Sequence, residues 1–143
     1  MKIAICGSLD FTYEIQKLAE KLKKNGHQVT IPISSQKIIK GEFSLKTIVK
    51  EKQNNSIFKR AIKYNVIKEY WKIIKKSDAI LIANYDKNDI KNYIGGNTFL
   101  EMGFAHVLNK TIYLLNNIPE MSYTSEIKTM KPIVIKNNLS KIK

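Results

Sequence analysis

One glutamate is the residue of this sequence best placed to do chemistry. Residues 95–105 read Gly-Gly-Asn-Thr-Phe-Leu-Glu-Met-Gly-Phe-Ala, so Glu101 lies within the first turns of a predicted helix, after two glycines. Glycines let the backbone approach a ligand closely, and the N–H groups at a helix N-terminus attract anions and other acceptors. A carboxylate in such a place can act as a nucleophile or as a general acid or base.

Glu101 also has a purely structural interpretation. Thr98 precedes it by three residues, ahead of an apolar run, which is the spacing of a capping box in which the glutamate bonds the Thr98 backbone N–H. Against this, helical spacing places Glu101 at the edge of an apolar stripe made by Leu100, Phe104 and Leu108, so its side chain is directed toward a cleft. Spacing alone leaves the catalytic carboxylate and the helix cap equally open.

The elements that must position Glu101 alternate between strands and helices. Apolar runs predict strands at residues 3–6, 27–33, 79–83, 111–115 and 132–135. Helical spacing predicts helices at 10–24, 61–74, 98–108 and 122–130, whereas residues 34–59 are predicted to form a loop with a helical piece. This order predicts an α/β fold in one domain spanning 1–143, with a five-stranded, mostly parallel sheet between helices, flavodoxin/Rossmann-like in its three layers.

In such a sheet, ligands bind beyond the carboxyl ends of the strands. This rule selects the loops 7–10, 84–97 and 116–125 as the predicted site. None of them contains the glycine-rich motif of a dinucleotide dehydrogenase or of a P-loop nucleotidase, which disfavours both classes. No group of His, Cys, Asp and Glu has metal-ligand spacing, so we expect neither a metal nor another cofactor.

The charge of the chain is strongly basic and uneven. There are 25 Lys and Arg residues against 12 Asp and Glu, and twelve of the basic residues lie between Gln36 and Lys76 with only three acidic ones. A basic face can bind phosphate or nucleic acid, but the excess is almost entirely lysine, which favours a solvated surface.

The sequence also predicts a cytoplasmic protein outside the membrane. It has a lone cysteine, Cys6, and no apolar run near the roughly 20 residues of a membrane span.

Three segments together resemble the nucleoside 2-deoxyribosyltransferase superfamily, which includes the 2'-deoxynucleoside 5'-monophosphate N-glycosidases. They are the turn Cys6-Gly7-Ser8, the approach to the third strand at Ser77-Asp78-Ala79, and residues 95–105. The resemblance spans most of the chain in strand order. It implies that Glu101 attacks the anomeric carbon of a nucleoside or nucleoside 5'-monophosphate and displaces the base, and that another base or water resolves the glycosyl-enzyme. It also implies a homodimer or higher homo-oligomer.

The resemblance also implies a binding site for the sugar or its 5'-phosphate, called the cradle below. Gly7 and Ser8 match the family's first-strand loop, where Leu9 and Asp10 replace the arginine of the N-glycosidases. Gly95 stands where the transferases place a carboxylate for the 5'-hydroxyl, which leaves space for a 5'-phosphate. Gly96 and Asn97 complete the cradle.

Five further residues follow from the same resemblance. Tyr70, with Glu69 beside it, stands where the N-glycosidases carry an aspartate, so these two are the candidates for catalytic help with the base. Asp78 matches a common family position, with a helix-to-strand cap as its alternative. Tyr123 and Lys128 follow the fourth strand, in a region that reaches a neighbouring subunit's pocket in the family.

Two other functions stay open. The absence of a matching general acid motivates a second hypothesis, a non-catalytic nucleotide sensor on the same scaffold, beside the favoured one of an enzyme acting on the N-glycosidic bond. The lysine-rich segment 36–76 is compatible with a nucleic-acid-binding module, which the scarcity of arginine disfavours.

Overall fold

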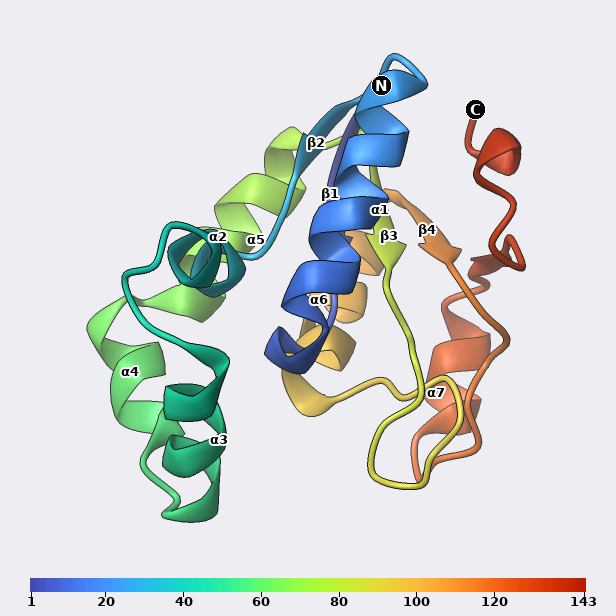
Figure 1. Cartoon of the computed structure of the whole chain (residues 1–143). Coiled ribbons are helices and arrows are strands. Elements are labelled where there is room, and N and C mark those ends of the chain that lie inside the picture. Colours follow the sequence, from blue (N-terminus) through green and yellow to red (C-terminus); the bar gives the residue numbers. More distant parts are fainter.

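Five strands form one sheet in the computed structural model, which describes residues 1–143. They are β1 (Lys2–Cys6), β2 (Gln28–Thr30), β3 (Ala79–Ile82), β4 (Thr111–Leu114) and β5 (Ile133–Val134). Their order is β2-β1-β3-β4-β5, and every neighbouring pair is parallel (Figure 1). The predicted α/β fold with a five-stranded sheet is confirmed, and the sheet is parallel throughout.

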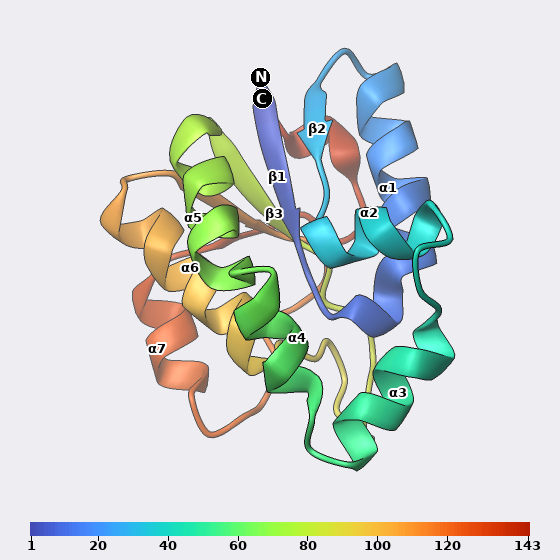
Figure 2. The same cartoon turned by 90° about the vertical axis from the view of Figure 1, so that its left-hand side faces the viewer.

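Helices cover both faces of the sheet (Figures 1 and 2). Helix α1 (Thr12–Lys24) and a C-terminal 3-10 turn, η2 (Leu139–Lys141), pack on one face. Helices α5 (Val66–Lys76), α6 (Gly96–Val107) and α7 (Thr124–Thr129) cover the other. Successive strand side chains point to opposite faces, so Ile5 packs under α1 while Cys6 packs under α5 and α6. Burial on both sides explains why the strands are continuous apolar runs.

Residues 34–59 are more regular than predicted. They contain α2 (Ile33–Ile39), α3 (Leu45–Gln53) and the start of α4 (Ile57–Lys63). Each of these helices is short, and α4 buries none of its residues, so a sustained apolar period could not arise in the sequence. Ser44 supplies the one local signal, because its hydroxyl caps α3 by accepting from the Thr47 N–H.

The predicted helix at 61–74 is wrong in one respect, because the structure divides it into α4 and α5. Asn65 lies between them with a left-handed backbone (φ 49°), a conformation that asparagine adopts more readily than most residues. Predicted strand 27–33 is also too long: it ends at Thr30, because Pro32 caps α2 and Ile33 begins it. Helix α1 is preceded by a 3-10 turn, η1 (Leu9–Phe11). No helix combines the length and the apolar character that crossing a bilayer requires.

Candidate active site

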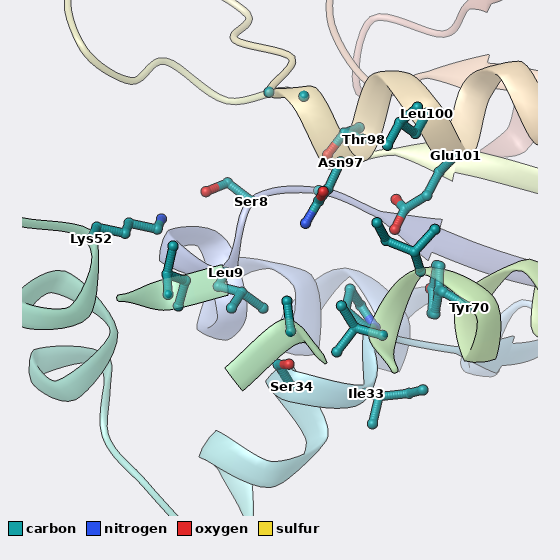
Figure 3. Close-up of a pocket in the computed structure, with 18 of the residues that line it drawn as sticks. Ser8, Leu9, Ile33, Ser34, Lys52, Tyr70, Asn97, Thr98, Leu100 and Glu101 are labelled. Atoms are coloured by element: carbon teal, nitrogen blue, oxygen red, sulfur yellow. The ribbon is translucent and has the colours of Figure 1, made fainter. Parts of the chain in front are cut away.

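A cavity of about 500 Å³ opens at the carboxyl end of the sheet, where parallel strands present ligand sites. The turn after β1, the start of α2, the helices α3 to α5, the loop between β3 and α6, and the first turns of α6 line it (Figure 3). Seven of the predicted site residues meet there: Gly7, Ser8, Tyr70, Gly95, Gly96, Asn97 and Glu101.

Glu101 is not a helix cap. Helix α6 begins at Gly96 with Gly95 as its N-cap, so Thr98 is already the third helical residue and the capping-box interpretation is wrong. The Glu101 carboxylate accepts no backbone hydrogen bond from its own helix and forms no ion pair with a Lys or Arg side chain. It points from α6 into the cavity, toward α5 (Figure 3).

The environment of Glu101 favours its protonated form. Burial raises the pKa of the Glu101 carboxyl group to about 8, and a hydrogen bond with the Cys6 thiol acts weakly in the opposite direction. Burial also raises the pKa of the Cys6 thiol, and the charge of Glu101 adds to that effect. Glu101 therefore retains its proton at neutral pH unless a ligand brings positive charge to it.

Tyr70 is the second titratable group at this end of the pocket. It is buried on α5, and its hydroxyl donates to the Ile5 carbonyl at the end of β1. Burial raises the pKa of Tyr70 well above its usual value, with smaller contributions from Cys6 and Glu101. Because its one proton is already bonded to Ile5, Tyr70 supports the wall of the pocket. Its predicted companion Glu69 does not line the cavity and instead pairs with Lys72 at 2.7 Å.

The opposite end of the pocket is polar and contains two lysines that sequence reasoning missed. Lys87 Nζ donates to Ser8 Oγ at 2.9 Å and lies 2.7 Å from an Asp10 carboxylate oxygen. Lys52 Nζ, from α3, lies 3.0 Å from the other Asp10 oxygen. Burial alone would raise the pKa of Asp10, but the hydrogen bonds and charges of Lys87 and Lys52 hold it below its usual value. Asp10, which was predicted to bind substrate, does not line the cavity. It holds the two lysines in place through its ion pairs with them.

No local pattern could have singled out Lys52 and Lys87. Lysine is abundant in this chain, Lys52 lies in a segment predicted to be mostly loop, and Lys87 lies in a long polar loop.

A third cation on the lining, Arg60, pairs with Glu51 through a 2.8 Å bond from Nε and lies 4.0 Å from the centre of the Phe43 ring.

Between these two ends, the wall of the pocket is apolar. It consists of side chains from α2, α4, α5 and α6, namely Ile33, Ile57, Val66, Ile67, Leu100 and Phe104. Apolar walls with a few placed polar groups are typical of small-molecule sites.

Besides Asp10 and Glu69, three more predicted site residues lie outside the cavity. Asp78 immediately precedes β3, and its carboxylate accepts the N–H of Lys2, the first residue of the neighbouring strand β1, at 2.7 Å. The Tyr123 hydroxyl donates to the Ile94 carbonyl, and its ring stacks on Phe99 with 4.5 Å between centroids. Lys128 is exposed on α7.

The lysine-rich segment forms the outer surface of α2 to α5. Three of its aromatic rings lie against its own cations: Phe43 against Arg60, Tyr64 against Lys37, and Trp71 against Lys75. These contacts leave the three rings less available to stack on bases, although Phe58 is exposed.

Nowhere in the structure do three or more His, Cys, Asp or Glu side chains gather as metal ligands would. Comparisons of the chain with protein-family models, with curated proteins and with solved structures found no significant match.

Proposed function

We propose that this protein is an enzyme that cleaves or exchanges the N-glycosidic bond of a nucleoside or a nucleoside 5'-monophosphate, with Glu101 as the nucleophile. The observation that carries this proposal is a carboxylate without a cationic partner or a capping bond, directed into a cavity of about 500 Å³ at the carboxyl end of a parallel sheet. A glycosidic nucleophile needs an oxygen free to reach the anomeric carbon.

The two ends of the cavity match the two ends of such a substrate. Lys52, Lys87 and Asp10 together carry one net positive charge beside Ser8, and the first N–H groups of α6 have no partner within the helix. This end suits the 5'-hydroxyl or 5'-phosphate of the sugar. The apolar wall, with Ile33 and Phe104, suits a planar base.

In the proposed reaction, a Glu101 oxygen bonds to the anomeric carbon as the bond from that carbon to the base nitrogen breaks. The resulting glycosyl ester is then attacked by water or by a second base, which returns the carboxylate. The positive charge that develops on the sugar stabilises ionised Glu101 and so opposes the effect of burial, which favours the protonated form.

Base release from a panel of nucleosides and 5'-monophosphates, with and without an acceptor base, tests this proposal by chromatography. Glu101→Gln removes the nucleophile while keeping the shape of the pocket, so turnover should fall by about a thousandfold or more while binding persists. Glu126→Gln, an exposed change on α7 outside the pocket, is the matched control and should keep full turnover.

The outcomes separate the candidate functions. A wild-type protein that binds nucleotides without releasing a base would be a sensor, which contradicts the proposal. Tight binding to random-sequence DNA with a steep salt dependence, and none to nucleotides, would favour the nucleic-acid module. The homo-oligomer implied by the resemblance stays a prediction.

A further inference from the structure

The lining of the pocket contains only one carboxylic acid. Glu101 is the sole Asp or Glu among the lining residues. The other proton donors there are committed or lie at the polar end. The Tyr70 hydroxyl bonds the Ile5 carbonyl, Lys52 and Lys87 pair with Asp10, and Tyr93 lies beneath Lys87, whose Nζ is 5.2 Å from its ring centre. If Glu101 is the nucleophile, no acidic side chain is left to protonate a departing base.

A neutral nucleobase is a poor leaving group unless it receives a proton. General acid catalysis of this kind contributes roughly 10²–10⁴-fold in rate. A base that is already a ring cation needs no proton, because it departs as a neutral molecule when it takes the electron pair of the glycosidic bond. A pocket with one carboxylate and no second carboxylic acid is therefore suited to cationic leaving groups.

The charges of the pocket agree with this requirement. The carboxylate end carries no cation: Glu101 forms no salt bridge, and its neighbours are the thiol of Cys6 and the phenol of Tyr70. The Ser8 end carries the net positive charge of Lys52 and Lys87 on Asp10. In Figure 3, Glu101 and Lys52 enter the cavity from opposite sides, with Asn97 and Thr98 between them. The complementary ligand has a cation near Glu101 and an anion near Ser8.

We propose that the substrate is an N-glycoside whose base is a ring cation, such as a pyridinium nucleotide, with its 5'-phosphate at the Ser8 end. This inference rests on the proposed function. Glu101 forms its bond to the anomeric carbon while the carbon–nitrogen bond breaks, and both electrons of that bond pass to the ring nitrogen, which gives a neutral pyridine. Water then attacks the anomeric carbon, the ester bond breaks to restore the carboxylate, and the water proton passes to solvent.

The positive ring of the substrate also favours the ionised form of Glu101. Burial holds the pKa of Glu101 at about 8, and an adjacent cation favours the ionised form of a carboxyl group. Binding a cationic nucleotide should therefore remove the Glu101 proton and prepare the nucleophile, whereas a neutral nucleoside should leave that proton in place.

A matched pair of substrates tests the proposal. Guanosine 5'-monophosphate and 7-methylguanosine 5'-monophosphate share the sugar and the phosphate and differ by a methyl group that makes the ring cationic. We expect kcat/KM for the methylated compound to exceed that for its partner by at least roughly 100-fold, the low end of what a missing general acid is worth. Nicotinamide mononucleotide should be cleaved as well. Equal rates, or faster release of guanine, would overturn the inference and leave the proposed function standing, whereas no release from any compound would overturn both.

A binding measurement gives a readout independent of turnover. The carbocyclic analogue of nicotinamide mononucleotide lacks the sugar ring oxygen and is not cleaved. Calorimetry at pH 7 in buffers of different ionisation enthalpy should show release of close to one proton on binding, since Glu101 is roughly nine-tenths protonated beforehand. Glu101→Gln should abolish this release and weaken, without abolishing, binding of the cationic analogue. Proton release unchanged in the variant, or absent in the wild type, would contradict the role of Glu101 as the partner of the cation.

Discussion

Lys87 Nζ lies 2.7 Å from Asp10, and this contact fastens the loop between β3 and α6 to the turn that follows β1. Asp10 also holds Lys52 of α3 at 3.0 Å, so one carboxylate joins three segments that are distant in sequence. All three contribute to the polar end of the pocket. The shape of that end therefore depends on a single acidic side chain.

Replacing Asp10 with asparagine should loosen these segments. The three side chains are partly exposed, so the loss of stability should be modest, about 1 kcal/mol, because water screens such pairs. Amide hydrogen exchange should accelerate in α3 and in residues 85–92. Glu42→Gln, which removes the more exposed 3.6 Å pair with Lys37, is the control and should leave exchange in these segments unchanged. Unaltered exchange in Asp10→Asn would show that the pocket wall does not depend on this carboxylate.

The buried carboxyl group of Glu101 should make stability fall as pH rises. Its pKa in the folded protein, about 8, lies above the unfolded value of 4.5, so the folded state binds the proton more tightly. That contribution to stability is complete below pH 4.5 and is lost between about pH 4.5 and 8, at up to ~1.4 kcal/mol per pH unit. Glu101→Gln should therefore be more stable than the wild type at pH 8, with the advantage shrinking toward pH 5. Urea unfolding at both pH values measures this, and parallel curves for the two proteins would contradict it.

Tyr70→Phe should affect stability more than turnover. The change leaves the buried Ile5 carbonyl without its donor, which costs about 1–3 kcal/mol. Because the hydroxyl proton is already bonded to Ile5, the rate of base release should change by less than about tenfold. Tyr13→Phe, at a half-exposed position on α1, should change neither quantity. A loss of turnover as large as that of Glu101→Gln, with unchanged stability, would identify Tyr70 as a proton donor.

The glycines at the two sides of the pocket should respond differently to an added methyl group. A Cβ at Gly7 would lie 3.1 Å from Ile15 Cδ1 and 3.2 Å from both the Cβ and the carbonyl oxygen of Ala83. Gly7→Ala should therefore destabilise the protein by about 1–3 kcal/mol, since the neighbouring backbone must shift. A Cβ at Gly96 would have no atom within 4 Å, so Gly96→Ala should keep or slightly raise stability. Denaturant unfolding of both variants checks the contrast, which equal losses would contradict.

The sequence predicted the elements that bury continuous apolar surface and failed on those that do not. Strand β3 is apolar on both sides because helices cover both faces of the sheet. Its run of apolar residues was therefore enough to predict a buried strand at this place in the sequence. Helix α4 buries none of its residues, and Asn65 separates it from α5. The spacing of apolar residues in the sequence therefore could not show that this segment contains two helices and not one. Loop composition did not reveal α2 or α3 because they are short and contribute few core residues.

The candidate site likewise has one part that the sequence predicted and another that only the tertiary structure decided. The residue types and spacing of 95–105 were enough to single out Glu101, and strand order was enough to place it at the carboxyl end of the sheet. Whether Glu101 caps its helix or faces a cavity depended on where α6 begins, and the structure places that start at Gly96. The partnership of Lys52, Lys87 and Asp10 joins residues up to 77 positions apart. Local sequence cannot encode such contacts, because they exist only when the folded chain brings α3 and the β3–α6 loop to the same turn.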